Sequence, residues 1–388
     1  MRVADPDRVR RRLLPLVGVA LVALIVGVFA GSRDEGSDPA GDTTDGSRAE
    51  ARRPGAAPRA LSLRQQVGQT MILSFAGTSP PGYVRKVLST GEASGVVLFA
   101  GNVRDAAQVR TLGSTLQRAA RGGALVSVDQ EGGSIRNLPF AAPAAGQPAQ
   151  GTPVVAREAA SAAARDLDAA GVNVTLAPVV DVTTGAGSFV AGRAFPGAAA
   201  AVSAITVGAL AGYEGTRVAS TVKHFPGLGA ATRSTDDVPV TIDRSRQELE
   251  RVELAPFRAA VAADAPLVMA SHALYPALDS RSIASQSRPI LVDLLRRRMG
   301  FRGAVITDSL EARAVLERSS VEEAAVRSLR AGADLMLTTG RGSYRPVYDR
   351  LLAEAERSPE FRRRVEESAG RVLQLKRRLG LRPPRPAG

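Results

Sequence analysis

The sequence contains no cysteine and no tryptophan, only two histidines, and few other aromatic residues. The absence of cysteine excludes disulfide bonds, thiolate catalysis, cysteine-ligated metals and cysteine-linked lipid anchors. The two histidines, His224 and His272, offer little from which to build a metal site, and we predict none. With so few aromatic side chains, a stacking platform for nucleic-acid bases is not expected.

The chain has 388 residues and a formal net charge of +13. Much of this excess lies near the two ends, in residues 8–12 (RVRRR) and 361–386, whereas the middle is rich in Ala, Gly and Val with scattered Arg. A basic balance can indicate nucleic-acid binding, but here no recognisable motif accompanies the charge. We therefore predict no nucleic-acid partner.

One long apolar run stands near the N-terminus. Residues 13–30 (LLPLVGVALVALIVGVFA) are eighteen uncharged residues that follow five arginines. This length just spans a bilayer, and the arginines place the preceding end in the cytoplasm. We predict an uncleaved signal-anchor over residues 1–30, so that the protein is tethered to the cell membrane by a single pass with the rest outside. The alternatives are a cleaved signal peptide followed by secretion and, more remotely, a buried helix.

After this run, residues 31–59 are rich in Gly, Ser, Asp, Pro and Arg without an apolar period, which is typical of a flexible linker. Residues 60–382 are predicted to form one domain, followed by a basic, Pro-rich tail over residues 383–388.

Eight short apolar runs alternate with Ala-rich stretches such as residues 105–120 and 244–261, which we predict to be helices. The runs are apolar on both faces, as buried parallel strands are. Eight strand–helix units over about 300 residues match a (β/α)8 TIM barrel, with a doubly wound open sheet as the alternative. The predicted strands lie within residues 71–75, 95–100, 124–131, 172–182, 218–225, 265–274, 303–310 and 333–339.

Polar residues end five of these runs. In a barrel the active site lies at the carboxyl ends of the strands, so these side chains are expected to meet there. Any single Asp in such a place also suits a helix cap or a turn, and for one at position 308 the cap of a helix over residues 309–319 is the alternative. The residues are Asp129, Gln130 and Glu131 after the third run, Asp181 after the fourth, Lys223 and His224 after the fifth, Ser271 and His272 after the sixth, and Asp308 after the seventh.

At these positions the chain resembles glycoside hydrolase family 3, and within it the short, single-domain β-N-acetylglucosaminidases. The resemblance extends from about residue 61 to residue 381 and is carried by VDQEGG (128–133), GRAF (192–195), KHFPG (223–227) and VITDSL (305–310) in that order. It implies a retaining β-glycosidase acting through a covalent glycosyl-enzyme intermediate, without a metal or other cofactor. The implied substrate is a carbohydrate with terminal β-linked N-acetylglucosamine or a related β-glycoside, and an extracytoplasmic position makes cell-wall glycan fragments the expected source.

The resemblance also assigns roles to residues. Asp308 corresponds to the catalytic nucleophile. The residues that correspond to substrate contacts are Asp129, Arg193, Lys223 and His224, to which we add Arg136, beside the position of a family arginine that is here Asn137, and His272.

One part of the family pattern is missing. The loop after Lys-His-Phe-Pro-Gly normally ends in Asp-Ser-His, where the His is the acid/base, and the corresponding positions here are Ser234, Thr235 and Asp236. In the first hypothesis Asp236, or its neighbour Asp237, is the acid/base. In the second, the protein is a weak or inactive hydrolase that serves as a glycan-binding module. In the third, a partner or another loop supplies the acid, or the donor and acceptor sugars differ. Paired carboxylates in such a loop also suit a solvated turn.

Overall fold

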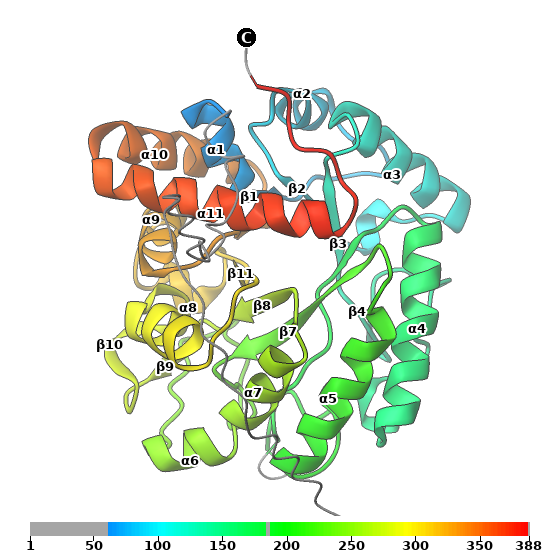
Figure 1. Cartoon of the computed structure of the whole chain (residues 1–388), viewed down its shortest axis with the longest axis vertical. Coiled ribbons are helices and arrows are strands. Elements are labelled where there is room, and N and C mark those ends of the chain that lie inside the picture. Colours follow the sequence, from blue (N-terminus) through cyan, green and yellow to red (C-terminus); the bar gives the residue numbers. More distant parts are fainter. Residues whose placement is uncertain (1–60, 184–186, 387–388) are drawn as a thin grey trace, which may run out of the picture. The chain divides into compact units, whose positions relative to one another are not determined.

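Eight short parallel strands form one sheet, which lies at the centre of the domain (Figure 1). The structure is a computed structural model that describes residues 61–183 and 187–386. The eight strands coincide with the eight predicted apolar runs, which confirms the predicted barrel strands. They are β1 (Met71–Leu73), β2 (Gly95–Leu98), β3 (Leu125–Val128), β6 (Val174–Thr175), β7 (Ala219–Phe225), β8 (Leu267–Ala270), β11 (Ala304–Thr307) and β12 (Met336–Thr338).

The sheet closes on itself. Its order is β11-β8-β7-β6-β3-β2-β1-β12, and every neighbouring pair is parallel. A parallel bridge between Ile306 of β11 and Leu335, next to β12, joins the two ends of this order. The backbone N–H of Thr307 also donates to the carbonyl of Leu335 at 2.9 Å. Closure excludes the open doubly wound sheet.

Helices surround the strands, and several begin at side-chain caps. Ser62 and Ser245 each form a capping box with a residue three positions later, which satisfies two backbone N–H groups of the first turn. The helices are α1 (Leu63–Gln69), α2 (Gly82–Thr90), α3 (Ala106–Ala119), α4 (Pro153–Ala169), α5 (Ala199–Tyr213), α6 (Arg246–Arg251), α7 (Leu254–Ala262), α8 (Arg313–Leu316), α9 (Val321–Ala331), α10 (Tyr344–Arg357), α11 (Pro359–Arg378) and the π-helical η5 (Pro289–Arg298). Short elements complete the domain: the hairpins β4 (Gln130–Gly132) with β5 (Ile135–Arg136) and β9 (Leu274–Tyr275) with β10 (Asp279–Ile283), and the 3-10 turns η2 (Ala100–Asn102), η3 (Gln147–Ala149) and η4 (Ala284–Gln286).

The helix predicted over residues 244–261 is interrupted. The structure has two helices there, α6 and α7, separated at Val252 and Glu253. Pro256 has no backbone N–H to donate one turn back, so an uninterrupted helix would lose a hydrogen bond at this point. Placed in the first turn of α7 instead, Pro256 is tolerated, because those N–H groups have no helical partner.

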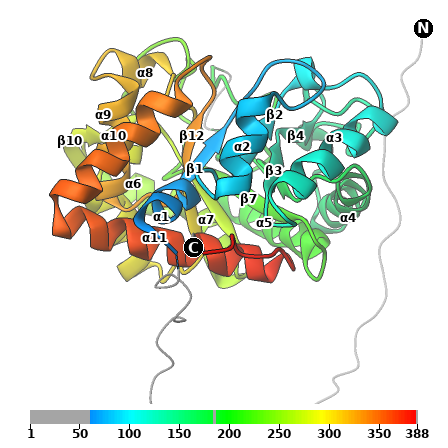
Figure 2. The same cartoon turned by 90° about the horizontal axis from the view of Figure 1, so that it is seen from above.

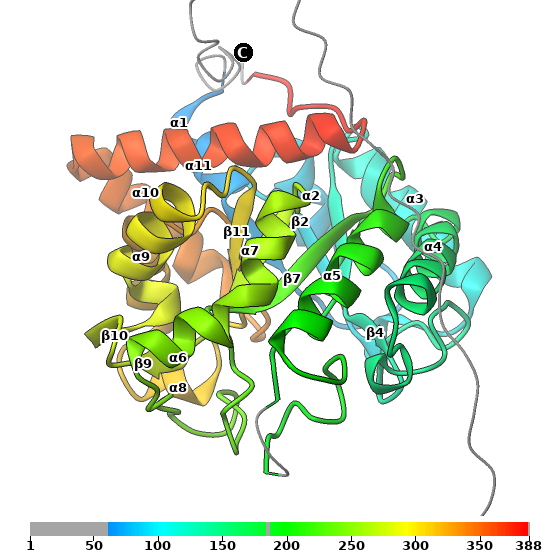
Figure 3. The ribbon, with the colours of Figure 1, turned by 60° about the horizontal axis from the view of Figure 1, so that its bottom comes forward.

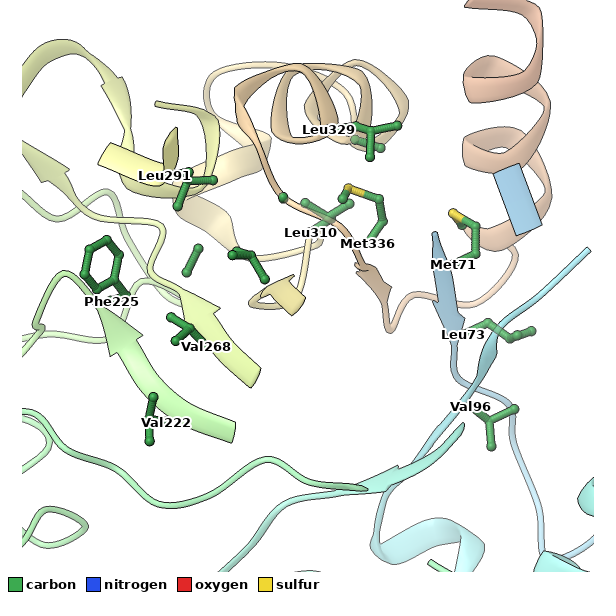
Figure 4. Packing of buried hydrophobic residues seen from close by; sticks show 14 of the residues in the cluster. Met71, Leu73, Val96, Val222, Phe225, Val268, Leu291, Leu310, Leu329 and Met336 are labelled. Carbon is green, nitrogen blue, oxygen red and sulfur yellow. The ribbon is translucent and has the colours of Figure 1, made fainter. Parts of the chain in front are cut away.

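Side chains of successive strand residues pack on opposite faces of the barrel wall. Val97 and Met269 belong to a cluster inside the barrel, whereas Val96 and Val268 pack outward against the helices (Figure 4). Both faces of each strand are therefore buried, which explains why the runs are apolar without alternation.

Helix α11 closes one end of the barrel (Figure 3). Its residues Val372 and Leu375, with Leu379 just beyond, join the interior cluster. The same helix packs beside α1 and α10, so the first and last helices of the domain are neighbours (Figure 2). This is the end at which the strands begin, and the predicted functional residues lie at the other end.

The predicted signal-anchor, residues 13–30, and the predicted linker, residues 31–59, lie outside the described residues. Among the helices of residues 61–183 and 187–386, none combines the length and apolar character that crossing a membrane requires.

Candidate active site

A buried ion-pair network lies at the carboxyl ends of β3 and β7. Lys223 is 1% exposed, and its Nζ lies 2.7 Å from Asp129 Oδ1 and 2.7 Å from Glu131 Oε1. Arg193, from the loop after β6, donates two bonds to Glu131, from Nε at 2.9 Å and from Nη2 at 2.7 Å. Burial acts to raise the pKa of Glu131, but Lys223 and Arg193 outweigh it and hold that pKa at about 2. The network stays charged at neutral pH and keeps both cations in fixed positions.

His224 is oriented by Asp181, which is fully buried. One carboxylate oxygen of Asp181 lies 2.7 Å from His224 Nδ1, and the other accepts from the backbone N–H groups of His224 at 3.1 Å and Leu228 at 2.7 Å. A carboxylate only accepts, so His224 Nδ1 carries a hydrogen and Nε2 is the ring nitrogen that does not bind Asp181. Asp181 thus fixes both the ring and the loop that follows it.

Asp308 follows β11 and is half-buried. Its Oδ1 accepts from the backbone N–H of Ser309 at 2.8 Å. Burial acts to raise the pKa of Asp308, but interactions with His224, His272 and Lys223 outweigh it, and the net shift is downward. The carboxylate is therefore ionised at neutral pH. It does not cap the next helix, since α8 has its own N-cap residue further along the chain.

His272 lies behind this turn, with 0% of its surface exposed. Its Nε2 is 2.9 Å from the carbonyl oxygen of Ser309, and its Nδ1 is 2.7 Å from Ser285 Oγ. Because a carbonyl only accepts, Nε2 carries the hydrogen. Burial lowers the pKa of His272. A sugar contact from this ring would require it to give up one of the two bonds.

The loop that carries Asp236 is fixed to the segment after Asp308. The backbone N–H groups of Arg313 and Ala314 donate to the carbonyls of Asp236 and Thr235, each at 3.1 Å. Partial desolvation of its carboxyl and the negative charge of Asp308 raise the pKa of Asp236, although the residue as a whole is exposed. The two carboxyl groups are thus an interacting pair with opposite pKa shifts, one ionised and one more readily protonated.

Comparison with known proteins agrees with this arrangement. The model of the glycosyl hydrolase family 3 N-terminal domain matches residues 62–375. The chain belongs to glycosyl hydrolase family 3. It is 33% identical over 340 residues to an uncharacterized secreted glycosyl hydrolase of Arthroderma benhamiae, covering 82% of this chain and 95% of that protein. It is 32% identical over 303 residues to a beta-hexosaminidase of Xanthomonas oryzae pv. oryzae, covering 76% and 88%. Among solved structures it resembles a family 3 beta-N-acetylglucosaminidase from Paenibacillus, with a TM-score of 0.78 and 35% identity, covering 82% of this chain and 63% of that one.

The chain therefore differs from the pattern expected of its family at Ser234, Thr235 and Asp236, where the resemblance predicts Asp-Ser-His. The structure separates the two candidate carboxylates of this loop. Asp236 interacts electrostatically with Asp308. Within the described residues, the Asp237 side chain makes no hydrogen bond or ion pair with the groups of the site; both residues of the pair are exposed.

Two residues of this candidate site were not among the predicted contacts. Glu131 and Asp181 were noted only as polar strand ends, yet one bridges Lys223 to the GRAF arginine and the other orients His224. The signal was their position at strand ends next to cationic motifs. The predicted contact Arg136 folds back on its own loop, where Nε donates to the carbonyl of Ala141 at 2.9 Å.

Three carboxylates of the site are paired with cationic or imidazole side chains of the protein. Asp129 and Glu131 face Lys223, and Asp181 accepts from His224. Across residues 61–183 and 187–386, no group of three or more His, Asp or Glu side chains is arranged to hold a metal ion.

Proposed function

We propose that this chain is a retaining β-glycosidase that releases terminal β-linked N-acetylglucosamine, with Asp308 as the nucleophile and Asp236 as the acid/base. The observation that carries the proposal is the interacting pair of carboxyl groups with opposite pKa shifts at the open end of the barrel. Retaining glycosidases need two carboxyl groups in these two states, one to attack and one to donate a proton.

In the first step, the ionised Asp308 attacks the anomeric carbon on the face opposite the leaving group. The bond between that carbon and the glycosidic oxygen breaks, and Asp236 gives its proton to that oxygen. The cationic surroundings of Asp308 keep it unprotonated and available for attack. In the second step, the ionised Asp236 accepts a proton from water as the water attacks the glycosyl-enzyme ester, and Asp308 is regenerated.

The fixed loop supports the role of Asp236. Its backbone accepts hydrogen bonds from Arg313 and Ala314, the first two residues of α8. This helix begins only a few residues after Asp308. Acid and nucleophile are thereby held by one connected unit of structure, and no group from a second domain or partner is required.

We assign sugar recognition to the network around Lys223. Asp129 is 22% exposed in its side chain and Arg193 is 23% exposed, so each can reach a hydroxyl, while Glu131 behind them is 1% exposed. We assign a sugar hydroxyl to His224 Nε2 as well, because Nδ1 is already held by Asp181. Arg136 lies on the hairpin that follows Asp129. We assign His272 to the support of the Asp308 turn. The choice of N-acetylglucosamine rests on the relatives named beta-hexosaminidase and beta-N-acetylglucosaminidase.

We further propose that the enzyme acts outside the cytoplasm, on fragments of cell-wall glycan. The apolar run at residues 13–30 supports an export or anchoring signal, and one relative is described as secreted.

The test compares two substrates that differ in their need for an acid. A nitrophenolate leaves with little protonation, whereas a sugar alkoxide requires it. The wild-type chain is expected to hydrolyse both p-nitrophenyl β-N-acetylglucosaminide and the N-acetylglucosamine disaccharide. Asp308→Ala should abolish both reactions. Asp236→Asn should slow disaccharide hydrolysis by about 10²-fold or more while affecting the first step on the aryl glycoside far less.

Asp237→Asn is the matched control, because it removes a carboxylate from the adjacent position, and it should retain both activities. Equal losses in the two Asn variants would refute the role of Asp236. A wild-type chain that binds the disaccharide in calorimetry but turns over neither substrate would instead be a glycan-binding module, which the missing family His favours.

A further inference from the structure

A basic groove lies at the end of the barrel opposite the active site. It has a volume of about 1000 Å³ and is formed by the end of α3, the loops that lead into β3, β6 and β7, and the tail after α11. Five arginines and one carboxylate line it: Arg118, Arg121, Arg217, Arg382, Arg385 and Asp168.

These arginines are poorly neutralised. Arg217 lies 3.9 Å from Asp168, and the other four make no ion pair within the described residues. Elsewhere at the same end the chain does neutralise its arginines, since Arg364 and Arg371 lie 2.8 Å and 3.1 Å from the buried Asp334. Five like charges gathered around a single carboxylate create a positive potential that attracts anions.

The two walls of the groove are held at a fixed separation. On one wall the backbone N–H of Arg382 donates to the carbonyl of Gly122 at 3.0 Å. Further along, Gln65 Nε2 donates to the carbonyl of Arg385 at 2.6 Å. Gly122 has φ of +85°, and a Cβ there would contact the Arg382 side chain at 3.6 Å. The tail therefore carries its arginines in place beside α3 without consuming their guanidinium groups.

A second basic hollow adjoins the groove. A second hollow of about 470 Å³ shares Arg118 with it and adds Arg85 and Lys86 from α2. Neither lining contains an aromatic side chain, so nothing in this surface can stack on a nucleobase. A continuous basic track without stacking groups fits a ligand that is long and is recognised by its charge.

We propose that this groove binds a linear polyanion of the phosphodiester or polyphosphate type. Bound there, the polymer retains the protein while the carboxyl ends of the strands, with Asp308, point away from it. This inference goes beyond the proposed glycosidase activity and does not depend on it. A planar lipid surface fits less well, because the arginines line a concave track.

The test uses the full chain, with long-chain inorganic polyphosphate as the probe. Binding affinity is measured by calorimetry at 50 and 200 mM NaCl. We expect binding that weakens steeply with salt, as counterion release requires. The double variant Arg121→Ser/Arg382→Ser should lose about tenfold or more in affinity. The matched control is Arg281→Ser/Arg318→Ser, which removes two exposed arginines away from the groove and should bind as the wild type does.

Hydrolysis of the aryl glycoside is measured beside binding, and all four arginine substitutions should leave it unchanged, so failure of one proposal does not mask the other. No binding at 50 mM NaCl, or equal losses in the groove and control variants, would overturn the proposal. Vesicles containing an anionic phospholipid are the second arm. Binding to them without binding to polyphosphate would show a lipid surface and overturn it as well.

Discussion

Lys376 is a buried amine near the closed end of the barrel, and its burial predicts a strong pH dependence of stability. It is 2% exposed, and its Nζ donates to Gln69 Oε1 at 2.7 Å. No carboxylate lies within ion-pair distance of it among the described residues. Burial alone lowers the pKa of Lys376 to about 7, from an ordinary value of 10.5.

The sign follows from proton binding. Between pH 7 and 10.5 the unfolded chain holds a proton at this amine that the folded chain has lost, so stability rises with pH across that window. The cost of the buried amine is about 4 kcal/mol at pH 7 and falls to about 1 kcal/mol at pH 9.5. Lys376→Met removes this dependence but leaves Gln69 Oε1 without a donor, which costs about 1–3 kcal/mol at every pH.

The assay is chemical denaturation of wild type and Lys376→Met at both pH values. The free-energy difference between the two proteins should shift by about 3 kcal/mol in favour of the variant on going from pH 9.5 to pH 7. Lys376→Arg is a useful control, since a guanidinium keeps its charge and cannot relieve the cost by losing a proton. A difference between wild type and Lys376→Met that is the same at both pH values would refute the reasoning.

Three further predictions concern the active site. The pH profile of kcat/KM for disaccharide hydrolysis by the wild type should have two limbs. Activity should fall on the acid side below the ordinary Asp range, because the pKa of Asp308 is lowered, and on the alkaline side above that range, because the pKa of Asp236 is raised. The profile of Asp236→Asn should lack the alkaline limb. Asp181→Asn should cost about 2 kcal/mol of stability and lower kcat/KM, because an amide cannot accept all the bonds that this carboxylate receives. Wild-type stability in chemical denaturation together with wild-type kcat/KM would contradict it. Gly229→Ala should destabilise by about 3 kcal/mol in thermal unfolding, since its Cβ would lie 1.9 Å from a backbone carbonyl oxygen, and a melting temperature equal to the wild type would show that the loop can move.

The strands could be predicted because a parallel barrel buries both faces of its wall. Runs such as residues 95–100 and 303–310 are apolar without interruption, and polar residues begin where the wall ends. Helix boundaries were less accessible. The break between α6 and α7 depends on Pro256 and on the packing of buried Glu253 against Gly227, where a Cβ on the glycine would lie 2.5 Å from the Glu253 side chain.

The candidate site divides in a similar way. That Asp129, Lys223 and Asp308 would share one end of the barrel followed from strand polarity alone. The bridge that Glu131 forms between Lys223 and Arg193 could not be predicted in this way, because these residues are separated from Glu131 by at least 62 positions in the sequence. The different electrostatic surroundings of Asp236 and Asp237 could not be predicted either, because the two residues are adjacent and chemically identical.

The sequence by itself determined the strand number, the family and the identity of the charged groups, because each of these depends on local pattern and motif. Tertiary structure decided which of those groups are ionised and which are free to act. It buries Glu131 between two cations and places Asp236 within the field of Asp308. Among the described residues it gives Arg121 and Arg382 no carboxylate as an ion-pair partner. The protonation state of a carboxyl group depends on the charges and solvent around it, and only the folded chain brings those charges together.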